Sequence, residues 1–227
     1  MEHPDSHAAT PPAGTGLFVV FEGGDGAGKT TQADLLCSWL AAEGHDVVRT
    51  FEPGDSLAGR KIRELLLSPE TGDLDPRAET LLYSADKAQH LHEVVRPALG
   101  RGAVVVCDRY VDSMLAYQGA GRTVPLEEVT TLARWATGAL RPDLTVLLDV
   151  DPRESVADKV DKDRLESAGE AFHDRVRQGF LDLAAADPER YLVLPARREI
   201  RWIADQVATR VAQLLEMLSV PTGRIDP

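Results

Sequence analysis

The sequence predicts an α/β protein in which helices cover both faces of a parallel sheet. Short, bulky apolar runs of strand length recur along the chain, and amphipathic runs of helix length separate them. Strands joined through helices need right-handed crossover connections, which produce a parallel sheet. A glycine-rich segment also lies between the first apolar run and the first helical run, where such proteins place anion-binding loops.

The strands are expected where apolar runs are short. The first, at residues 17–21, is continuously apolar and ends in glycines, which suits a strand buried on both faces. A helix with apolar residues at 35, 36, 39 and 40 follows it. Further strands are predicted at residues 46–50, 103–107, 145–150 and 191–194, and helices at 58–67, 77–99, 111–118 and 126–138. A charged helix pair at 152–186 and an amphipathic helix that ends near 218 complete the pattern.

The chain is expected to form one domain. Its 227 residues are 43% hydrophobic, enough for one sizeable core, and no interdomain linker interrupts the strand–helix alternation. Residues 1–16 are rich in Pro, Ala and Gly without periodicity, so we expect a disordered tail there. The domain is predicted at 17–218, and residues 219–227 form a C-terminal tail.

The net charge of −12 argues against a protein that wraps nucleic acid or docks on acidic lipid. A small anionic substrate remains possible, because a local cluster of cations and backbone N–H groups can bind phosphate in an acidic protein. No apolar run has the length of a membrane span, and no signal peptide is present, so the protein is expected in the cytoplasm. Cys37 and Cys107 are predicted to be buried, reduced thiols, and the six His residues show no metal-ligand spacing.

Residues 23–30 match the pattern G-x-x-x-x-G-K-[ST] of a phosphate-binding loop. Glycines let successive N–H groups point at the phosphates of ATP, and Lys29 is expected to bridge the β- and γ-phosphates. Thr30 is expected to hold Mg²⁺. A glycine-rich strand-to-helix turn without a ligand is the alternative, but the flanking strand and helix favour ATP binding. The predicted ATP-binding residues are Gly23, Gly24, Asp25, Gly26, Ala27, Gly28, Lys29, Thr30 and Thr31.

A second polar pair follows the strand at 103–107. Asp108 ends this apolar run at the edge of the sheet where parallel α/β proteins bind ligands, so it is a candidate Mg²⁺ ligand. Arg109 comes next, and its guanidinium can bind phosphate with two hydrogen bonds. An ordinary polar strand end is the alternative interpretation.

With these motifs in place, the chain resembles the thymidylate kinase family of nucleoside monophosphate kinases. The matching segments include FEGGDGAGKTTQ at 21–32, EPG at 52–54, RAETLLYSADKAQH at 77–90, DRYVDSMLAYQGAGR at 108–122 and DRLES at 163–167. The resemblance covers roughly residues 17–218. It implies a three-layer fold with a five-stranded parallel sheet, a lid near 157–168, a homodimer, and transfer of a phosphoryl group from ATP·Mg²⁺ to dTMP.

The resemblance also assigns roles to single residues. Asp25 would accept a hydrogen bond from the deoxyribose 3′-hydroxyl, Arg109 would grip the dTMP phosphate, and Tyr83 would stack on thymine. Core packing is the alternative role of Tyr83, and a solvated acidic face is that of Asp163 and Glu166 in the lid. The substrate-binding residues implied in this way are Asp25, Glu52, Pro53, Tyr83, Lys87, Arg109, Ser113, Tyr117, Gln118, Asp163 and Glu166.

Four positions depart from the family pattern. Phe51 and Lys87 each replace an Arg, Met114 replaces a small polar residue, and Asp158 stands where relatives have a lid Arg. Catalysis is assigned to Lys29, Arg109 and Arg164. Since Asp158 carries no positive charge, Arg164 is the first choice for the lid cation, ahead of Lys159 and Lys162. An Arg164 that only pairs with a neighbouring carboxylate is the alternative. Two alternatives stay open: a kinase for another nucleoside monophosphate, and a nucleotide-binding homologue with weakened catalysis.

Overall fold

A computed structural model describes residues 16–121, 124–155 and 169–219 of the chain. Apart from Gly16 and Ser219 at their inner ends, the two predicted tails lie outside the described residues. The same holds for the predicted lid, including Asp158, Asp163, Arg164 and Glu166.

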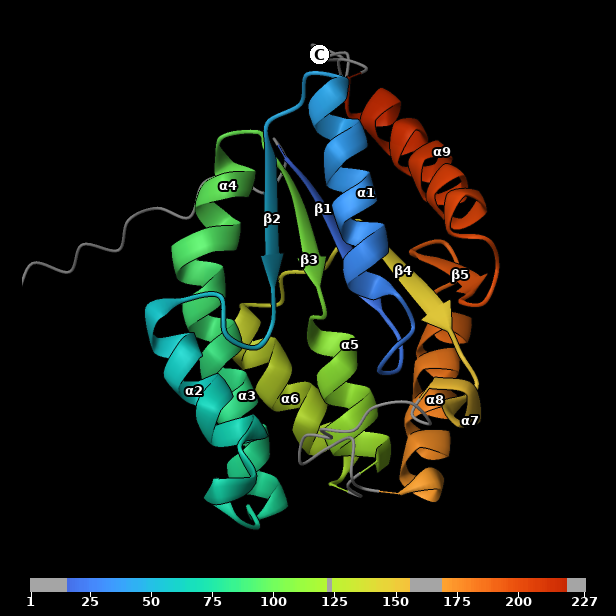
Figure 1. The fold of residues 1–227 in the computed structure, drawn as a ribbon. Coiled ribbons are helices and arrows are strands. Elements are labelled where there is room, and N and C mark those ends of the chain that lie inside the picture. The colour runs from blue at the N-terminus through green and yellow to red at the C-terminus, as the bar shows by residue number, and fades with distance from the viewer. Residues whose placement is uncertain (1–15, 122–123, 156–168, 220–227) are drawn as a thin grey trace, which may run out of the picture.

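The described residues contain one five-stranded parallel sheet, as predicted (Figure 1). Its strands lie in the order β2-β3-β1-β4-β5, and every neighbouring pair is parallel. Each strand end lies within one residue of its predicted position: β1 Leu17–Glu22, β2 Val47–Phe51, β3 Val104–Asp108, β4 Leu144–Asp149 and β5 Tyr191–Pro195.

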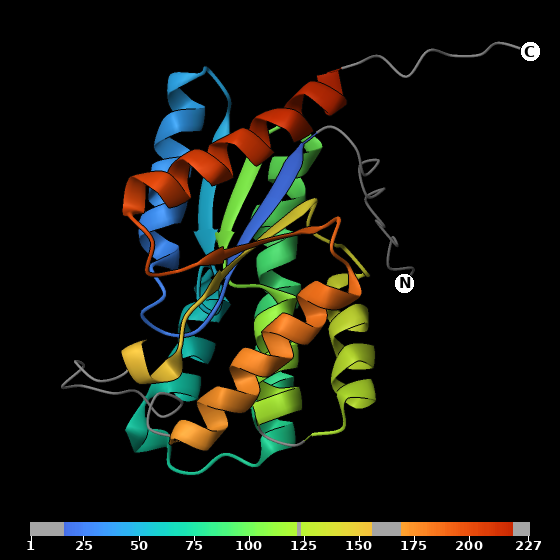
Figure 2. The same cartoon turned by 90° about the vertical axis from the view of Figure 1, so that its right-hand side faces the viewer.

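Helices cover both faces of this sheet, which confirms the three-layer α/β class. Figure 2 shows α1 on one side of the sheet and the α3–α4 run on the other. The predicted helix 77–99 is this continuous run, in which a π-helical stretch joins α3 to α4. The bounds are α1 Lys29–Ala42, α2 Leu57–Leu67, η1 Pro69–Thr71, α3 Pro76–His90, η2 Leu91–Val95, α4 Arg96–Gly100, α5 Val111–Met114, η3 Leu115–Gly121, α6 Leu126–Thr137, α7 Pro152–Ser155, α8 Glu170–Ala186 and α9 Ile200–Ser219.

The core follows from the two-residue period of the central strand. Val19 and Phe21 of β1 pack with α1 and α9, whereas Phe18 and Val20 face the opposite way and pack with α4. Because successive side chains of a strand point to opposite faces, a strand buried on both faces must be apolar throughout, as β1 is.

The carboxyl ends of β1 and β3 lie side by side, since Phe21 is paired with Asp108 in the sheet register. The chain leaves β1 toward α1 on one face and leaves β3 toward α5 on the other (Figure 1). A crevice opens where neighbouring strands part in this way, and open α/β sheets bind ligands there.

The predictions about the two cysteines and about membrane spans can be compared with the structure. Cys107 is buried as predicted, whereas the predicted burial is wrong for Cys37, which is only half-buried; neither cysteine forms a disulfide. Burial raises the pKa of the Cys37 thiol to about 11, so it stays protonated near neutral pH. Among the helices of the described ranges, none has both the length and the apolar character of a membrane span.

Candidate active site

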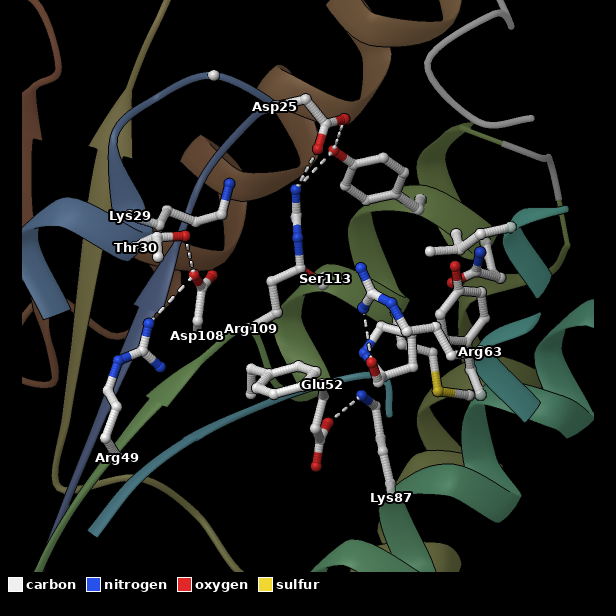
Figure 3. A pocket seen from close by; sticks show the side chains of 18 residues that line it. Asp25, Lys29, Thr30, Arg49, Glu52, Arg63, Lys87, Asp108, Arg109 and Ser113 are labelled. Carbon is white, nitrogen blue, oxygen red and sulfur yellow. Dashed lines mark hydrogen bonds and ion pairs between the residues drawn. The ribbon is translucent and has the colours of Figure 1, made fainter. Parts of the chain in front are cut away.

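A pocket of about 400 Å³ opens at the carboxyl edge of the sheet, at the parting of β1 and β3 (Figure 3). Eighteen residues from the phosphate loop, β2, α2, α3, β3 and α5–η3 line it. They are Asp25, Gly26, Lys29, Thr30, Arg49, Phe51, Glu52, Pro53, Arg63, Leu67, Tyr83, Lys87, Asp108, Arg109, Ser113, Met114, Tyr117 and Gln118.

The loop between β1 and α1 has the backbone that its glycines predict. Gly23, Gly26 and Gly28 have φ values of 134°, 71° and 90°, a region that residues with a Cβ rarely adopt. Gly28 caps α1 without a side-chain hydrogen bond, so the N-cap residue leaves the first N–H groups of the helix to other acceptors. A Cβ at Gly23 would come within 2.4 Å of the Leu148 carbonyl oxygen, so this turn also needs glycine for space.

Lys29 curls back over the loop. Its Nζ donates to the carbonyl oxygens of Gly23 at 3.0 Å and Gly24 at 2.7 Å. Burial, and then the positive charge of Arg109, lower the pKa of Lys29 from 10.5 to about 8. A phosphate anion beside the ammonium would reverse this effect, because an opposite charge favours the protonated form.

Thr30 and Asp108 form a small oxygen cluster at one end of the pocket (Figure 3). Thr30 Oγ1 donates to Asp108 Oδ2 at 2.7 Å, and Arg49 Nη2 lies 3.6 Å from the same carboxylate oxygen. A hydroxyl and a carboxylate beside a phosphate loop are the hard oxygen ligands that Mg²⁺ takes, with water and phosphate completing the shell. This donor set fits Mg²⁺.

Arg109 lies at the centre of the pocket and bonds to Asp25. Arg109 Nη2 is 2.5 Å from Asp25 Oδ1, and the Tyr117 hydroxyl donates to Asp25 Oδ2 at 3.0 Å (Figure 3). Burial alone would raise the pKa of Asp25, but the charges of Arg109 and Lys29 outweigh it and lower the pKa to about 2. Asp25 is therefore ionised throughout the physiological range.

A buried carboxylate, Glu22, binds residues on the C-terminal side of Arg109. Glu22 accepts hydrogen bonds from the N–H of Tyr110 at 2.8 Å and from the N–H and Oγ of Ser113 at 3.1 and 2.6 Å. Burial, and then the charge of Asp112, raise the pKa of Glu22 to about 7, although Arg109 lowers it in part.

Lys87 is bound to Glu52 rather than left free in the pocket. Lys87 Nζ lies 2.5 Å from Glu52 Oε2, and the two side chains are 3% and 1% exposed. His90 Nδ1 is 2.8 Å from Glu52 Oε1, and His90 Nε2 is 2.6 Å from Thr50 Oγ1. Burial alone would raise the pKa of Glu52, but Lys87 and His90 hold it below its ordinary value.

The end of the pocket away from Thr30 is more apolar. Tyr83, Met114 and Tyr117 belong to one buried cluster, against which Leu67 packs. Gln118 also lines the pocket, but its Nε2 donates to Glu79 Oε1 at 2.9 Å. Such a surface suits the flat face and apolar edges of a nucleobase.

The structure brings most predicted site residues together. Fifteen of the pocket-lining residues were singled out from the sequence, and three of them, Phe51, Lys87 and Met114, are among the four departures. Gly23, Gly24, Ala27, Gly28 and Thr31 do not line the pocket, and Thr31 is exposed on α1. Arg164, Asp163 and Glu166 lie outside the described residues.

Sequence reasoning missed several residues that shape the pocket. Arg49, Arg63 and Leu67 line it, and His90, to which no chemistry was given, is buried against Glu52. The helical spacing was a usable signal for His90, since residues three apart share one helix face and Lys87 was already a candidate. No comparable local signal exists for Arg49 or Arg63.

Known proteins resemble this chain closely. The family model described as thymidylate kinase matches residues 21–207, a range that spans every pocket-lining residue. The thymidylate kinase of Cutibacterium acnes is 63% identical over 200 residues, with 88% of this chain and 98% of that protein covered. That of Clavibacter michiganensis is 53% identical over 205 residues, with 88% and 97% covered. A crystal structure of thymidylate kinase from Ehrlichia chaffeensis aligns with a TM-score of 0.73 and 32% identity, covering 86% of this chain and 98% of that one.

Proposed function

The chain belongs to the thymidylate kinase family, and from this premise we propose that the pocket of Figure 3 transfers the γ-phosphoryl group of ATP to dTMP. The protein is a dTMP kinase, and its products are dTDP and ADP. The observation that best supports this use of the pocket is the convergence of Lys29 and Arg109. They follow two neighbouring strands, β1 and β3, and line the same pocket, Lys29 at the end of the phosphate loop and Arg109 at the pocket centre.

The phosphate loop is the proposed ATP end. Its N–H groups and the start of α1, which no side chain of the N-cap residue caps, favour anions. Lys29 supplies a cation, and because burial destabilises its charged form, a nearby phosphate would stabilise it. Thr30 and Asp108 would hold Mg²⁺ there. When bound, Mg²⁺ neutralises charge on the β- and γ-phosphates.

Arg109 is the proposed ligand of the dTMP phosphate. Its guanidinium donates to neutral and anionic oxygens of the protein, among them Asp25. A phosphate can replace these acceptors because it forms charge-assisted hydrogen bonds of its own. Asp25, released from part of this pairing, would then accept from the sugar 3′-hydroxyl, and Tyr117 would lie along the sugar.

The proposed base site is the apolar end of the pocket. Tyr83 is already packed among Met114 and its neighbours, so its ring would stack on thymine without losing much conformational freedom. Glu52, Pro53, Ser113 and Gln118 complete the wall around the nucleotide. Arg164, with Asp163 and Glu166, stays a prediction for the lid.

A homodimer is also part of the proposal. Large apolar side chains are exposed on α2, α3 and α6. Helix α3 packs against both α2 and α6. Leu81 of α3 is 56% exposed and Trp135 of α6 is 81% exposed. Apolar surface that is gathered on neighbouring helices is a common sign of a protein interface.

The test is a coupled assay that measures ADP release with each of four nucleoside monophosphates in turn: dTMP, dUMP, dCMP and dGMP. We expect dTMP to give the highest kcat/KM. Lys29→Ala should lower kcat by about 10²–10³-fold, the usual loss of an electrostatic catalytic donor, with an unchanged circular dichroism spectrum. Lys61→Ala, which removes an exposed lysine outside the pocket, is the matched control and should keep wild-type turnover.

One observation favours a second candidate, a kinase with weaker base selectivity. Lys87 is one of the predicted substrate-binding residues, where its ammonium could donate to the base, but it is paired with Glu52 and almost fully buried. If Lys87 stays with Glu52 in the complex, the base loses that donor. The same panel decides, because dCMP or a purine monophosphate with the highest kcat/KM would contradict thymidylate as the substrate.

A further inference from the structure

Glu22 is a fully buried carboxylate at the carboxyl end of β1, one residue before the phosphate loop. It does not line the pocket. Its two oxygens nevertheless bind the segment that presents Arg109, and each oxygen binds a different part of it.

The first oxygen holds the backbone of the turn from β3 to α5. Glu22 Oε1 accepts from the N–H of Tyr110 at 2.8 Å and from the N–H of Ser113 at 3.1 Å. Arg109 lies at the start of this turn with φ 69°, in the left-handed region that residues with a Cβ rarely adopt. Its own N–H donates to Phe21 O at 2.9 Å. Such a conformation persists only where the surroundings enforce it, and hydrogen bonds to Phe21 and Glu22 do so here.

The second oxygen holds the side chain of Arg109 through a relay. The Ser113 hydroxyl donates to Glu22 Oε2 at 2.6 Å, so its oxygen lone pairs point away from Glu22. Arg109 Nη1 donates to the same Ser113 oxygen at 3.0 Å. When Glu22 is ionised, its negative charge strengthens that second bond, since linked hydrogen bonds polarise one another in a buried site.

We propose that Glu22 is a positioning residue for dTMP: it fixes Arg109 through the Tyr110 N–H and the Ser113 hydroxyl and does not touch the nucleotide itself. The inference rests on the proposed role of Arg109 at the dTMP phosphate. It predicts that a change at Glu22 weakens dTMP binding and leaves ATP binding almost intact, because Lys29 and the loop glycines make no hydrogen bond to Glu22 among the described residues.

The central variant is Glu22→Gln. The amide oxygen can take the place of Oε1 and keep both backbone hydrogen bonds, whereas the NH₂ group replaces Oε2 and leaves the Ser113 hydroxyl without its acceptor. Asp143→Asn is the matched control. Asp143 also accepts a backbone N–H of β1, that of Phe18 at 2.7 Å, but at the other end of the strand.

Calorimetric titration measures dTMP affinity without turnover, and steady-state kinetics measure the KM for ATP. In Glu22→Gln we expect the Kd of dTMP to rise about tenfold, as for a misplaced hydrogen bond to a charged group, and the KM for ATP to change less than about twofold. Asp143→Asn should change neither value. A dTMP affinity of folded Glu22→Gln within about twofold of wild type would overturn the proposal, as would an equal loss in both variants.

Ser113→Ala tests the relay separately and also serves if Glu22→Gln does not fold. It should weaken dTMP binding, and adding Glu22→Gln to it should cause little further loss, because both changes break one chain of contacts. Losses that multiply in the double variant would show independent effects and overturn the relay, and unchanged binding in Ser113→Ala would do the same. Failure of the wild-type protein to bind dTMP would refute the proposed function itself, and this inference with it.

Discussion

The buried ammonium of Lys29 predicts that the stability of the free protein depends on pH in an unusual range. The fall of its pKa from 10.5 to about 8 means that the folded state binds a proton less tightly than the unfolded chain does. At about 1.4 kcal/mol per pKa unit, the difference amounts to about 3 kcal/mol.

The direction follows from proton binding. Between pH 8 and pH 10.5 the unfolded chain keeps the Lys29 proton that the folded protein loses, so stability rises with pH in this window. Below pH 8 both states hold the proton, so the folded state carries the full unfavourable free energy of the buried charge. Lys29→Met has no group that titrates here, so the wild-type protein should gain up to about 3 kcal/mol relative to this variant across the window.

The assay is urea denaturation of both proteins without nucleotide, from about pH 7 to about pH 10, with the difference in unfolding free energy plotted against pH. Titrating groups that do not interact with Lys29 cancel in the difference, and Asp25, whose pKa depends on Lys29, titrates far below this window. Lys61→Met is the control and should give no slope, because Lys61 is exposed on α2. A difference between wild type and Lys29→Met that stays constant with pH would refute the reasoning and mean that Lys29 keeps an ordinary pKa.

Three further predictions concern the metal, the buried ion pair and assembly. Asp108→Asn should raise the Mg²⁺ concentration for half-maximal activity about tenfold or more, while Asp143→Asn does not, and an unchanged Mg²⁺ requirement would remove Asp108 from the metal site. Lys87→Met leaves Glu52 charged and buried, so it should cost about 3–5 kcal/mol in urea denaturation, and a cost below about 1 kcal/mol would contradict the pair. Leu81→Asp should shift the mass seen by light scattering from dimer to monomer, whereas Met217→Asp on α9 should not; a dimer that survives Leu81→Asp places the interface elsewhere.

Much of the candidate site could be predicted because its signals are local. The phosphate loop needs glycines at fixed places in one turn, and Gly23, Gly26 and Gly28 have the positive φ values that explain them. Asp108 and Arg109 could be found because an apolar strand that ends in polar residues points them at the ligand edge of a parallel sheet.

The partners of these residues could not be predicted in the same way. Nothing within a few positions of Lys87 indicates that Glu52, 35 residues earlier, takes its ammonium. Arg49 was passed over as part of a strand, although its guanidinium reaches Asp108 on the neighbouring strand. Glu22 looked like the end of an apolar run, and its contacts with Ser113 span 91 residues.

By itself, the sequence therefore determined the class of fold, the order of its elements and the position of the proposed phosphate loop. Those properties depend on the two-residue and 3.6-residue periods and on the backbone freedom of glycine, which act within a few residues. Only the tertiary structure decided that Lys87 pairs with Glu52, that Arg109 is held by both Asp25 and Ser113, and that Glu22 lies behind them. Distant segments that come together in space decide which charges pair and which are buried. The free energy of a charged side chain therefore depends more on these tertiary contacts than on its neighbours along the chain.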